Sequence, residues 1–153
     1  MTSIDNLEKR CIKFTTIQGF VLGFVGLFIL ITFPLLPHYF PNLNKYSQLS
    51  GLLWIFSAYV VSIPWWHAQN YFMINNKGKS LMNLTIVSCI IGYVIWFLCM
   101  WSLGSIGIYF GFFIQTLVRS IIVYLKAKEN WNLKFDWPGI VIGMFLLLIS
   151  LVF

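Results

Sequence analysis

The chain has 153 residues, of which 59% are hydrophobic, 19% aromatic and only 9% charged, and its mean hydropathy is +0.85. A soluble fold could not hide this much apolar surface, so the composition excludes a soluble globular domain and indicates an integral membrane protein. The net charge of +6 would favour a nucleic-acid ligand in a soluble domain. In a membrane protein the same lysines and arginines first report topology, and we expect no nucleic-acid partner.

Five apolar segments separated by charges and turn residues are candidate membrane spans. The first is predicted to stop at Pro34 and Pro37, and residues 38–45 are predicted to form a loop. Residues 81–125 contain neither acid nor lysine. As one helix they would measure roughly 65 Å, about twice the hydrocarbon thickness, so we expect a turn at residues 102–105. The predicted spans cover about residues 14–35, 48–66, 81–101, 105–125 and 138–153.

The predicted fold is therefore all-α, a polytopic bundle of membrane helices that forms a single domain over residues 1–153. Four spans replace five if the last short segment does not cross. Asp5 followed by Glu8 is typical of a helix start, so a short amphipathic segment is expected to lead into the first span without a break. That span is too long for the apolar region of a cleavable signal peptide.

The charges predict the orientation of these spans. Lys45 alone falls on one side of the membrane, and eight basic residues fall on the other, which places the N-terminus inside and the C-terminus on the opposite face. We expect a multi-pass protein of a bacterial or mitochondrial inner membrane. The eight residues are Lys9, Arg10, Lys13, Lys77, Lys79, Lys126, Lys128 and Lys134.

Residues 62–72, SIPWWHAQNYF, form a polar and aromatic cluster at the inner end of the second predicted span. Tryptophan and tyrosine are enriched at the level of lipid head groups, so these residues can be an interfacial anchor. Alternatively, Trp66, His67 and Gln69 line an inward-facing pocket for a head group, a quinone or a partner helix. Pro64 would favour such a pocket by loosening the helix and freeing a carbonyl group.

A second pattern lies in the fourth predicted span, where small or polar residues recur every four positions on one helix face. Glycines spaced in this way let helix backbones approach closely, although the spacing is also common by chance in apolar helices. Similar pairs in the first and fifth spans predict that spans one, four and five could pack together. The residues are Gly107, Gly111, Gln115 and Arg119 in span four, Gly19 and Gly23 in span one, and Gly139 and Gly143 in span five.

Arg119 is the only charged residue inside a predicted span, and no span supplies an acid to pair with it. Two interpretations stay open. Its side chain could extend inward to lipid phosphate, to Asp136 or to Glu129, as a purely structural charge. Alternatively, Arg119 and Gln115 contact an anionic head group, a ligand or a partner.

Several chemistries are excluded by the placement of reactive residues. His38 and His67 are predicted to lie on opposite faces of the membrane, so they cannot share a metal ion or a haem. The three cysteines are expected to be free thiols. No span contains a carboxylate, and no phosphate-binding glycine loop or nucleophile elbow is present. We therefore predict no enzyme activity, no cofactor and no metal. The four carboxylates are Asp5, Glu8, Glu129 and Asp136.

The order of several sequence blocks resembles a family of small inner-membrane proteins of unknown function, which occurs in bacteria and includes the mitochondrial transmembrane protein 69. The blocks are residues 19–33, 56–67, 95–96 and 111–115, of which the last reads GFFIQ. The chain departs from the family pattern at Trp66, which is followed by histidine where the family has glycine. The resemblance implies an inner-membrane location and brings no activity with it.

These observations lead to three functional hypotheses. The first is a non-catalytic accessory subunit, assembly factor or stabilising partner of a larger membrane complex, because the chain is rich in aromatic and small-residue faces and has little mass outside the membrane. Its partners would be the lipid bilayer and other membrane subunits, or further copies of itself. The second is a small transporter or channel that could act as an oligomer, with a pathway that includes Gln115 and Arg119. The third is an immunity-type protein that blocks a membrane-active toxin.

The predicted topology has a direct test. A reporter fused after Phe153 should face the periplasm or the intermembrane space, and a cysteine introduced near Lys77 should be labelled only from the inside. A reporter found on the inner side instead would show that the fifth segment does not span, and the four-helix arrangement would replace the five-helix one.

Overall fold

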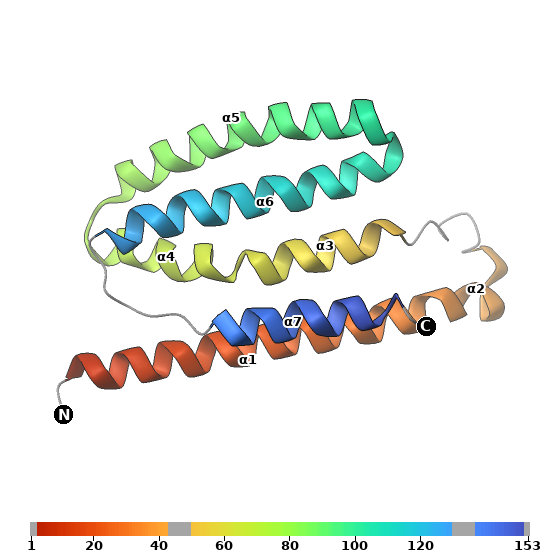
Figure 1. The fold of residues 1–153 in the computed structure, drawn as a ribbon, viewed down its shortest axis with the longest axis horizontal. Helices are drawn as coiled ribbons and strands as arrows, with labels where there is room; N and C mark the ends of the chain where they lie inside the picture. Colours follow the sequence, from red (N-terminus) through yellow and green to blue (C-terminus); the bar gives the residue numbers. More distant parts are fainter. Residues whose placement is uncertain (1–2, 43–49, 130–136, 152–153) are drawn as a thin grey trace.

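The computed structural model describes residues 3–42, 50–129 and 137–151, and within these residues the chain is helical with no strand. The all-α class predicted from the sequence is confirmed. Figure 1 shows the helices running along one common direction. In chain order they are α1 (Ser3–Thr32), the 3-10 turn η1 (Phe33–Leu35), α2 (Leu36–Tyr39), α3 (Ser50–Val61), α4 (Ile63–Ile74), α5 (Gly78–Leu103), α6 (Ser105–Lys128) and α7 (Trp137–Ile149).

Within the described residues, three stretches are long and apolar enough to cross a membrane, as expected of a membrane protein. They are Ile12–Tyr39, Gly78–Leu103 and Ser105–Lys128. Helix α7 is apolar but has only 13 residues, and α3 and α4 have 12 residues each. The length of the helices therefore separates α1, α5 and α6 from the shorter α3, α4 and α7.

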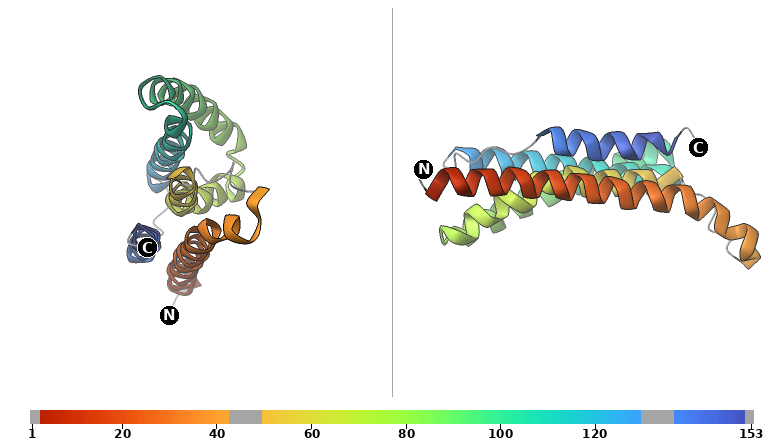
Figure 2. Two further views of the ribbon diagram at one scale, coloured as in Figure 1. Left: turned by 90° about the vertical axis from the view of Figure 1, so that its right-hand side faces the viewer. Right: turned by 90° about the horizontal axis from the view of Figure 1, so that it is seen from below.

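The helices form an open layer and not a closed bundle. In Figure 1, α5 lies at one edge, followed by α6, then by α3 with α4, and finally by α1 with α7 at the other edge. Figure 2 shows the layer from one end as a curved row of helices. Helix α5 packs along α6 and touches α4, and its only buried residues are Ser88 and Gly92.

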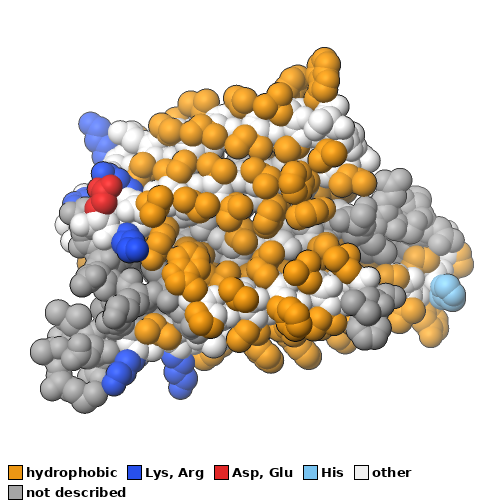
Figure 3. Space-filling model, viewed as in Figure 1, with side chains coloured by type: hydrophobic (Ala, Val, Ile, Leu, Met, Phe, Trp, Pro, Cys, Tyr) orange, Lys and Arg blue, Asp and Glu red, His pale blue; other side chains and the backbone are white. Residues whose placement is uncertain are grey.

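The basic side chains gather at one end of this layer, as Figure 3 shows for the face in view. This end contains the start of α1, the α4–α5 connection and the end of α6. Hydrophobic side chains cover the remaining length of the helices on the same face. Lys45 and Lys134 lie outside the described residues.

The chain around the first predicted span agrees with the prediction at its start and differs from it at its end. Helix α1 starts at Ser3, and the expected unbroken entry into the first span is confirmed. The loop predicted for residues 38–45 is wrong at its start, because α2 includes His38 and Tyr39. Pro34 and Pro37 lie in the first turns of η1 and α2, where a missing backbone N–H removes no helical hydrogen bond.

The second predicted span is divided at Ser62 and continues to Ile74, well past its expected end at residue 66. Pro64 stands in the first turn of α4 and cannot donate a backbone hydrogen bond, so the ladder is interrupted there. The Ser62 hydroxyl donates to the carbonyl of Tyr59 at 2.7 Å, which satisfies one acceptor next to the interruption. The result is a kinked pair of short helices that together run alongside α6 within the layer.

The turn predicted for residues 102–105 is confirmed, because α5 ends at Leu103 and α6 starts at Ser105. Gly104 between them has a φ of +61°, a conformation that residues with a Cβ atom rarely adopt. A one-residue connection forces α5 and α6 to run antiparallel in close contact, so this glycine determines how the two helices pair.

Glycines also determine which helices touch. A Cβ atom added at Gly19 would lie 2.2 Å from the carbonyl oxygen of Gly139, and one at Gly23 would lie 2.7 Å from Gly143 Cα, so α1 and α7 meet backbone to backbone. The prediction that spans one, four and five share one interface is wrong for span four. A Cβ atom added at Gly107 would lie 2.0 Å from the carbonyl oxygen of Cys99, and Gly111 faces Trp96. The glycines of α6 therefore contact α5.

These contacts predict which glycines tolerate a methyl group. Gly19→Ala and Gly107→Ala should each lower the stability of the protein in detergent by about 1–3 kcal/mol, because the added atom overlaps a backbone that cannot move aside. Gly78→Ala is the matched control, since nothing lies within 4 Å of its added Cβ. Thermal unfolding followed by circular dichroism measures all three, and equal midpoints for Gly78→Ala and Gly107→Ala would contradict the packing described.

Candidate functional site

A cleft of about 170 Å³ lies between α6 and the kinked pair α3 and α4. We call it the Arg119 cleft. Four of its nine lining residues are aromatic, and one of these, Tyr59 of α3, is 45% exposed. Three of the four residues predicted as ligand or partner contacts line it, namely Arg119, Gln115 and Trp66. The full lining is Ala58, Tyr59, Ser62, Trp65, Trp66, Phe112, Gln115, Thr116 and Arg119.

The guanidinium group of Arg119 lies flat against the indole of Trp65, with 3.8 Å between the guanidinium carbon and the ring centroid. Such a cation–π contact stabilises a desolvated arginine by about 2 kcal/mol. An arginine at the centre of a membrane helix costs about 3 kcal/mol on insertion scales, so the contact offsets only part of the cost. The Nε atom of Arg119 and the Nε1 atom of Trp65 are both buried without a hydrogen-bond partner.

The acid expected to pair with Arg119 is engaged elsewhere. Glu129 forms its ion pair with Lys126, which is the only ion pair within the described parts of the chain. Asp136, the other acid considered, lies outside the described residues. Within the described residues, the guanidinium group of Arg119 lies over Trp65 of α4 and pairs with no acid.

Gln115 lies one turn before Arg119 on α6 and packs against α5. A Cβ atom added at Gly92 would lie 2.3 Å from Gln115 Cγ, so the absence of a side chain at Gly92 makes room for the glutamine. The neighbouring Thr116 uses its hydroxyl to donate to the carbonyl of Phe112 at 2.8 Å. Gln115 and Arg119, one turn apart on α6, both line the cleft and carry side-chain N–H donors, as does Trp65 of α4.

His67 lies on a different side of α4 from the cleft. Its Nε2 atom is 3.0 Å from Gln18 Oε1 and 3.4 Å from Thr15 Oγ1, and the ring of Phe14 meets the imidazole edge to face at 5.9 Å. All three partners belong to α1. The predicted grouping of His67 with Trp66 in one pocket is therefore wrong, because the imidazole faces α1 and does not line the cleft.

The aromatic cluster of residues 62–72 is not simply a head-group anchor. His67 and Tyr71 are buried, and Tyr71 contributes to a core with Phe72 and with Val123 of α6. The Tyr71 hydroxyl accepts a hydrogen bond from Lys77 Nζ at 2.8 Å. No local pattern in the sequence marks the continuation of α4 past residue 66 to Ile74. This continuation places the cluster among neighbouring helices.

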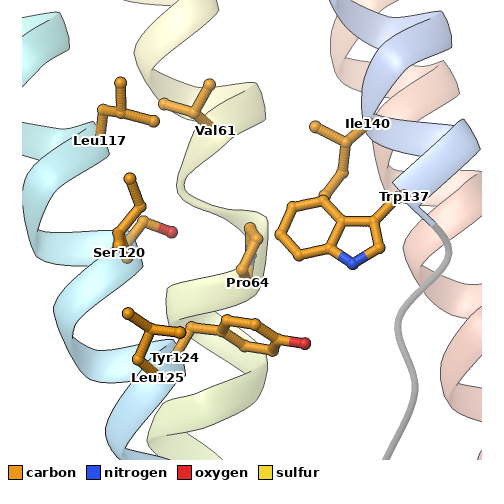
Figure 4. A pocket seen from close by; sticks show the side chains of 9 residues that line it. Val61, Pro64, Leu117, Ser120, Tyr124, Leu125, Trp137 and Ile140 are labelled. Carbon is orange, nitrogen blue, oxygen red and sulfur yellow. The ribbon is translucent and has the colours of Figure 1, made fainter. Parts of the chain in front are cut away.

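A second cavity, of about 250 Å³, lies between α6, α7 and the α3–α4 kink. Figure 4 shows Pro64 between the α6 side chains and those of α7, with Trp137 and Ile140 on the far side. The Tyr124 and Trp137 rings meet edge to face at 5.6 Å. The lining is apolar except for the hydroxyl groups of Tyr124 and of Ser120, whose buried Oγ has no hydrogen-bond partner. This cavity can accept an apolar group and offers no charge.

Metal chemistry has no support in the described residues, among which no group of three His, Cys, Asp or Glu side chains could hold an ion. Cys89 and Cys99 are free thiols, and Cys11 lies outside the described side chains. The Arg119 cleft can bind an anion or a strong hydrogen-bond acceptor. Among the residues that line it, no nucleophile stands beside a base.

The polar contact between α1 and α4 has a measurable strength. In a double-mutant cycle, Gln18→Ala and His67→Ala should show a coupling of about 0.6 kcal/mol, the average for hydrogen bonds between membrane helices. Gln18→Ala with Gln69→Ala serves as the control cycle, because Gln69 shares no hydrogen bond with Gln18 among the described contacts. A coupling equal to the control would mean that the Gln18–His67 contact contributes nothing.

No family model matches this chain, and the searches of curated proteins and of solved structures return no match. The resemblance to the transmembrane protein 69 family therefore stays a prediction. Any function has to follow from the arrangement of the helices and from the polar residues that they bring together.

Proposed function

We propose that this protein is a non-catalytic accessory subunit, assembly factor or stabilising partner of a larger membrane complex. The observation that carries this proposal is the buried, unpaired Nε of Arg119 in a cleft between membrane helices. An intramembrane charge without a partner is costly, and proteins that retain one generally use it. Association with another membrane protein would supply the missing acceptor.

The open shape of the helix layer supports the same proposal. Helix α5 covers one edge and leaves large apolar side chains exposed along its length, among them Ile90, Phe97 and Trp101. Both lipid and a neighbouring helix fit such a surface. A protein that works alone as a compact bundle has no need of an edge helix with two buried residues.

We infer a five-span topology with the N-terminus inside a bacterial or mitochondrial inner membrane. The kinked pair α3 and α4 contributes one crossing, because its two helices of 12 residues each together exceed the roughly 20 residues needed to span the hydrocarbon core. The basic residues at one end of the layer then all face the inside. With α7 too short to cross, four spans would remain and the inside would be unchanged.

A transporter or channel is less well supported by the site. A conduction path needs polar groups along the whole membrane depth. Beyond Gln115, towards Gly104, the space between α3 and α6 is filled by Trp54, whose ring centroid lies 4.8 Å from that of Phe110 and 5.4 Å from that of Phe113. The Arg119 cleft therefore ends within the described helices, as expected for a recognition site.

The proposal predicts that the protein leaves its native membrane together with an integral membrane protein of different sequence. Native mass spectrometry after gentle extraction with native lipid should show a particle containing one copy of this chain and at least one such partner. A particle that contains only copies of this chain, or this chain with lipid alone, would contradict the accessory-subunit proposal.

A further inference from the structure

The guanidinium group of Arg119 has one interaction surface in use and another free. Its flat face stacks on Trp65, while the edge that carries the N–H groups makes no ion pair with any described residue, and Nε has no hydrogen-bond partner. This edge is the part of arginine that forms paired hydrogen bonds with a carboxylate. The contact with Trp65 holds the guanidinium group at the wall of the cleft.

The anion cannot come from the spans of this chain. The 153 residues contain four carboxylates, and all lie outside the three apolar stretches that can cross a membrane or at the inner end of one. Glu129 follows the last residue of α6 and is paired with Lys126. A second copy of the chain would carry the same set, so it offers no acid at the depth of Arg119.

The depth of Arg119 distinguishes a protein partner from a lipid head group. Arg119 lies about 4 Å along the axis from the midpoint of α6, whereas lipid phosphates lie about 15 Å from the bilayer centre. Side chains on a helix lean towards its N-terminus, which for α6 is the Gly104 turn and not the basic end. A phosphate would have to be drawn about 10 Å into the hydrocarbon, whereas an acid on a membrane helix can occupy any depth.

We propose that the Arg119 cleft receives an aspartate or glutamate side chain from a transmembrane helix of another protein, and that the carboxylate pairs with the free edge of the guanidinium group. The size of the cleft fits one side chain, since a cavity of about 150 Å³ holds a molecule such as benzene. Gln115, one turn away on α6, also lines the cleft. This inference rests on the proposed function and names the chemistry of the partner.

The test uses synthetic transmembrane peptides as probes. Each is a leucine-rich helix as long as α6 with a single central glutamate, or with glutamine in its place, and is reconstituted with the full-length protein in phosphatidylcholine nanodiscs at mildly alkaline pH. Energy transfer between labelled peptide and labelled protein measures association. The glutamate peptide should bind about tenfold more tightly than the glutamine peptide, a difference of about 1.4 kcal/mol.

Variants of the protein assign this preference to the cleft. Arg119→Gln should remove it, and Arg119→Lys should reduce it severalfold, because lysine keeps the charge but lacks the planar fork. Lys126→Gln is the matched control, since it removes one positive charge outside the cleft and should leave the preference unchanged. Arg119→Lys keeps the test informative where Arg119→Gln does not fold.

Three results of the peptide assay would overturn the proposal, and a fourth comes from the native complex. The first is equal binding of the two peptides by the wild-type protein, and the second is a preference that survives Arg119→Gln or is undiminished in Arg119→Lys. The third is competition between phosphatidylglycerol and the glutamate peptide, with binding of this lipid lost in Arg119→Gln. That result would assign the cleft to a lipid. A native complex that persists in the Arg119→Gln variant would refute this inference alone, whereas a wild-type protein without a partner would refute the proposed function.

Discussion

Close backbone contact at glycines is the constraint on which the arrangement of this protein depends. Apolar side chains gain nothing by leaving lipid for a neighbouring helix, so membrane helices associate where small residues let the backbones meet and increase dispersion contact. Gly19 and Gly23 bring α1 onto α7, and Gly107 and Gly111 bring α6 onto α5. Two tightly paired units result, and the kinked helices α3 and α4 connect them through larger side chains.

The kink in turn positions the polar residues. Because the ladder is interrupted beside Pro64, α4 departs from the line of α3 and carries Trp65 over Arg119 of α6, while His67 meets Gln18 of α1. The two polar contacts differ in whether the polar group has a hydrogen-bond partner within the described chain. The imidazole of His67 has partners within the molecule, whereas the guanidinium of Arg119 has an aromatic face and no acceptor for Nε. Only the second contact calls for a group from outside the chain.

An open layer is consistent with this difference. Helices that must enclose a substrate path need partners on several sides, but α5 packs along α6 and has only two buried residues. The molecule thus presents an apolar edge at α5 and a recessed charge between α6 and α4. A membrane protein that assembles with another can use the first for extended contact and the second for specificity, since a buried charge favours one complementary partner and penalises others.

The sequence by itself determined the helical class, the α5–α6 turn at Gly104 and the candidate status of Arg119, Gln115 and Trp66, because hydropathy, glycine and intramembrane charge are local signals. Only the tertiary structure decided which helices the glycines join, since a glycine face shows that a helix can approach closely but not which neighbour does so. It also separated His67 from Trp66 and brought Trp65 onto Arg119. These outcomes depend on helix rotation and on the kink at Ser62, which arise from contacts between segments far apart in the chain.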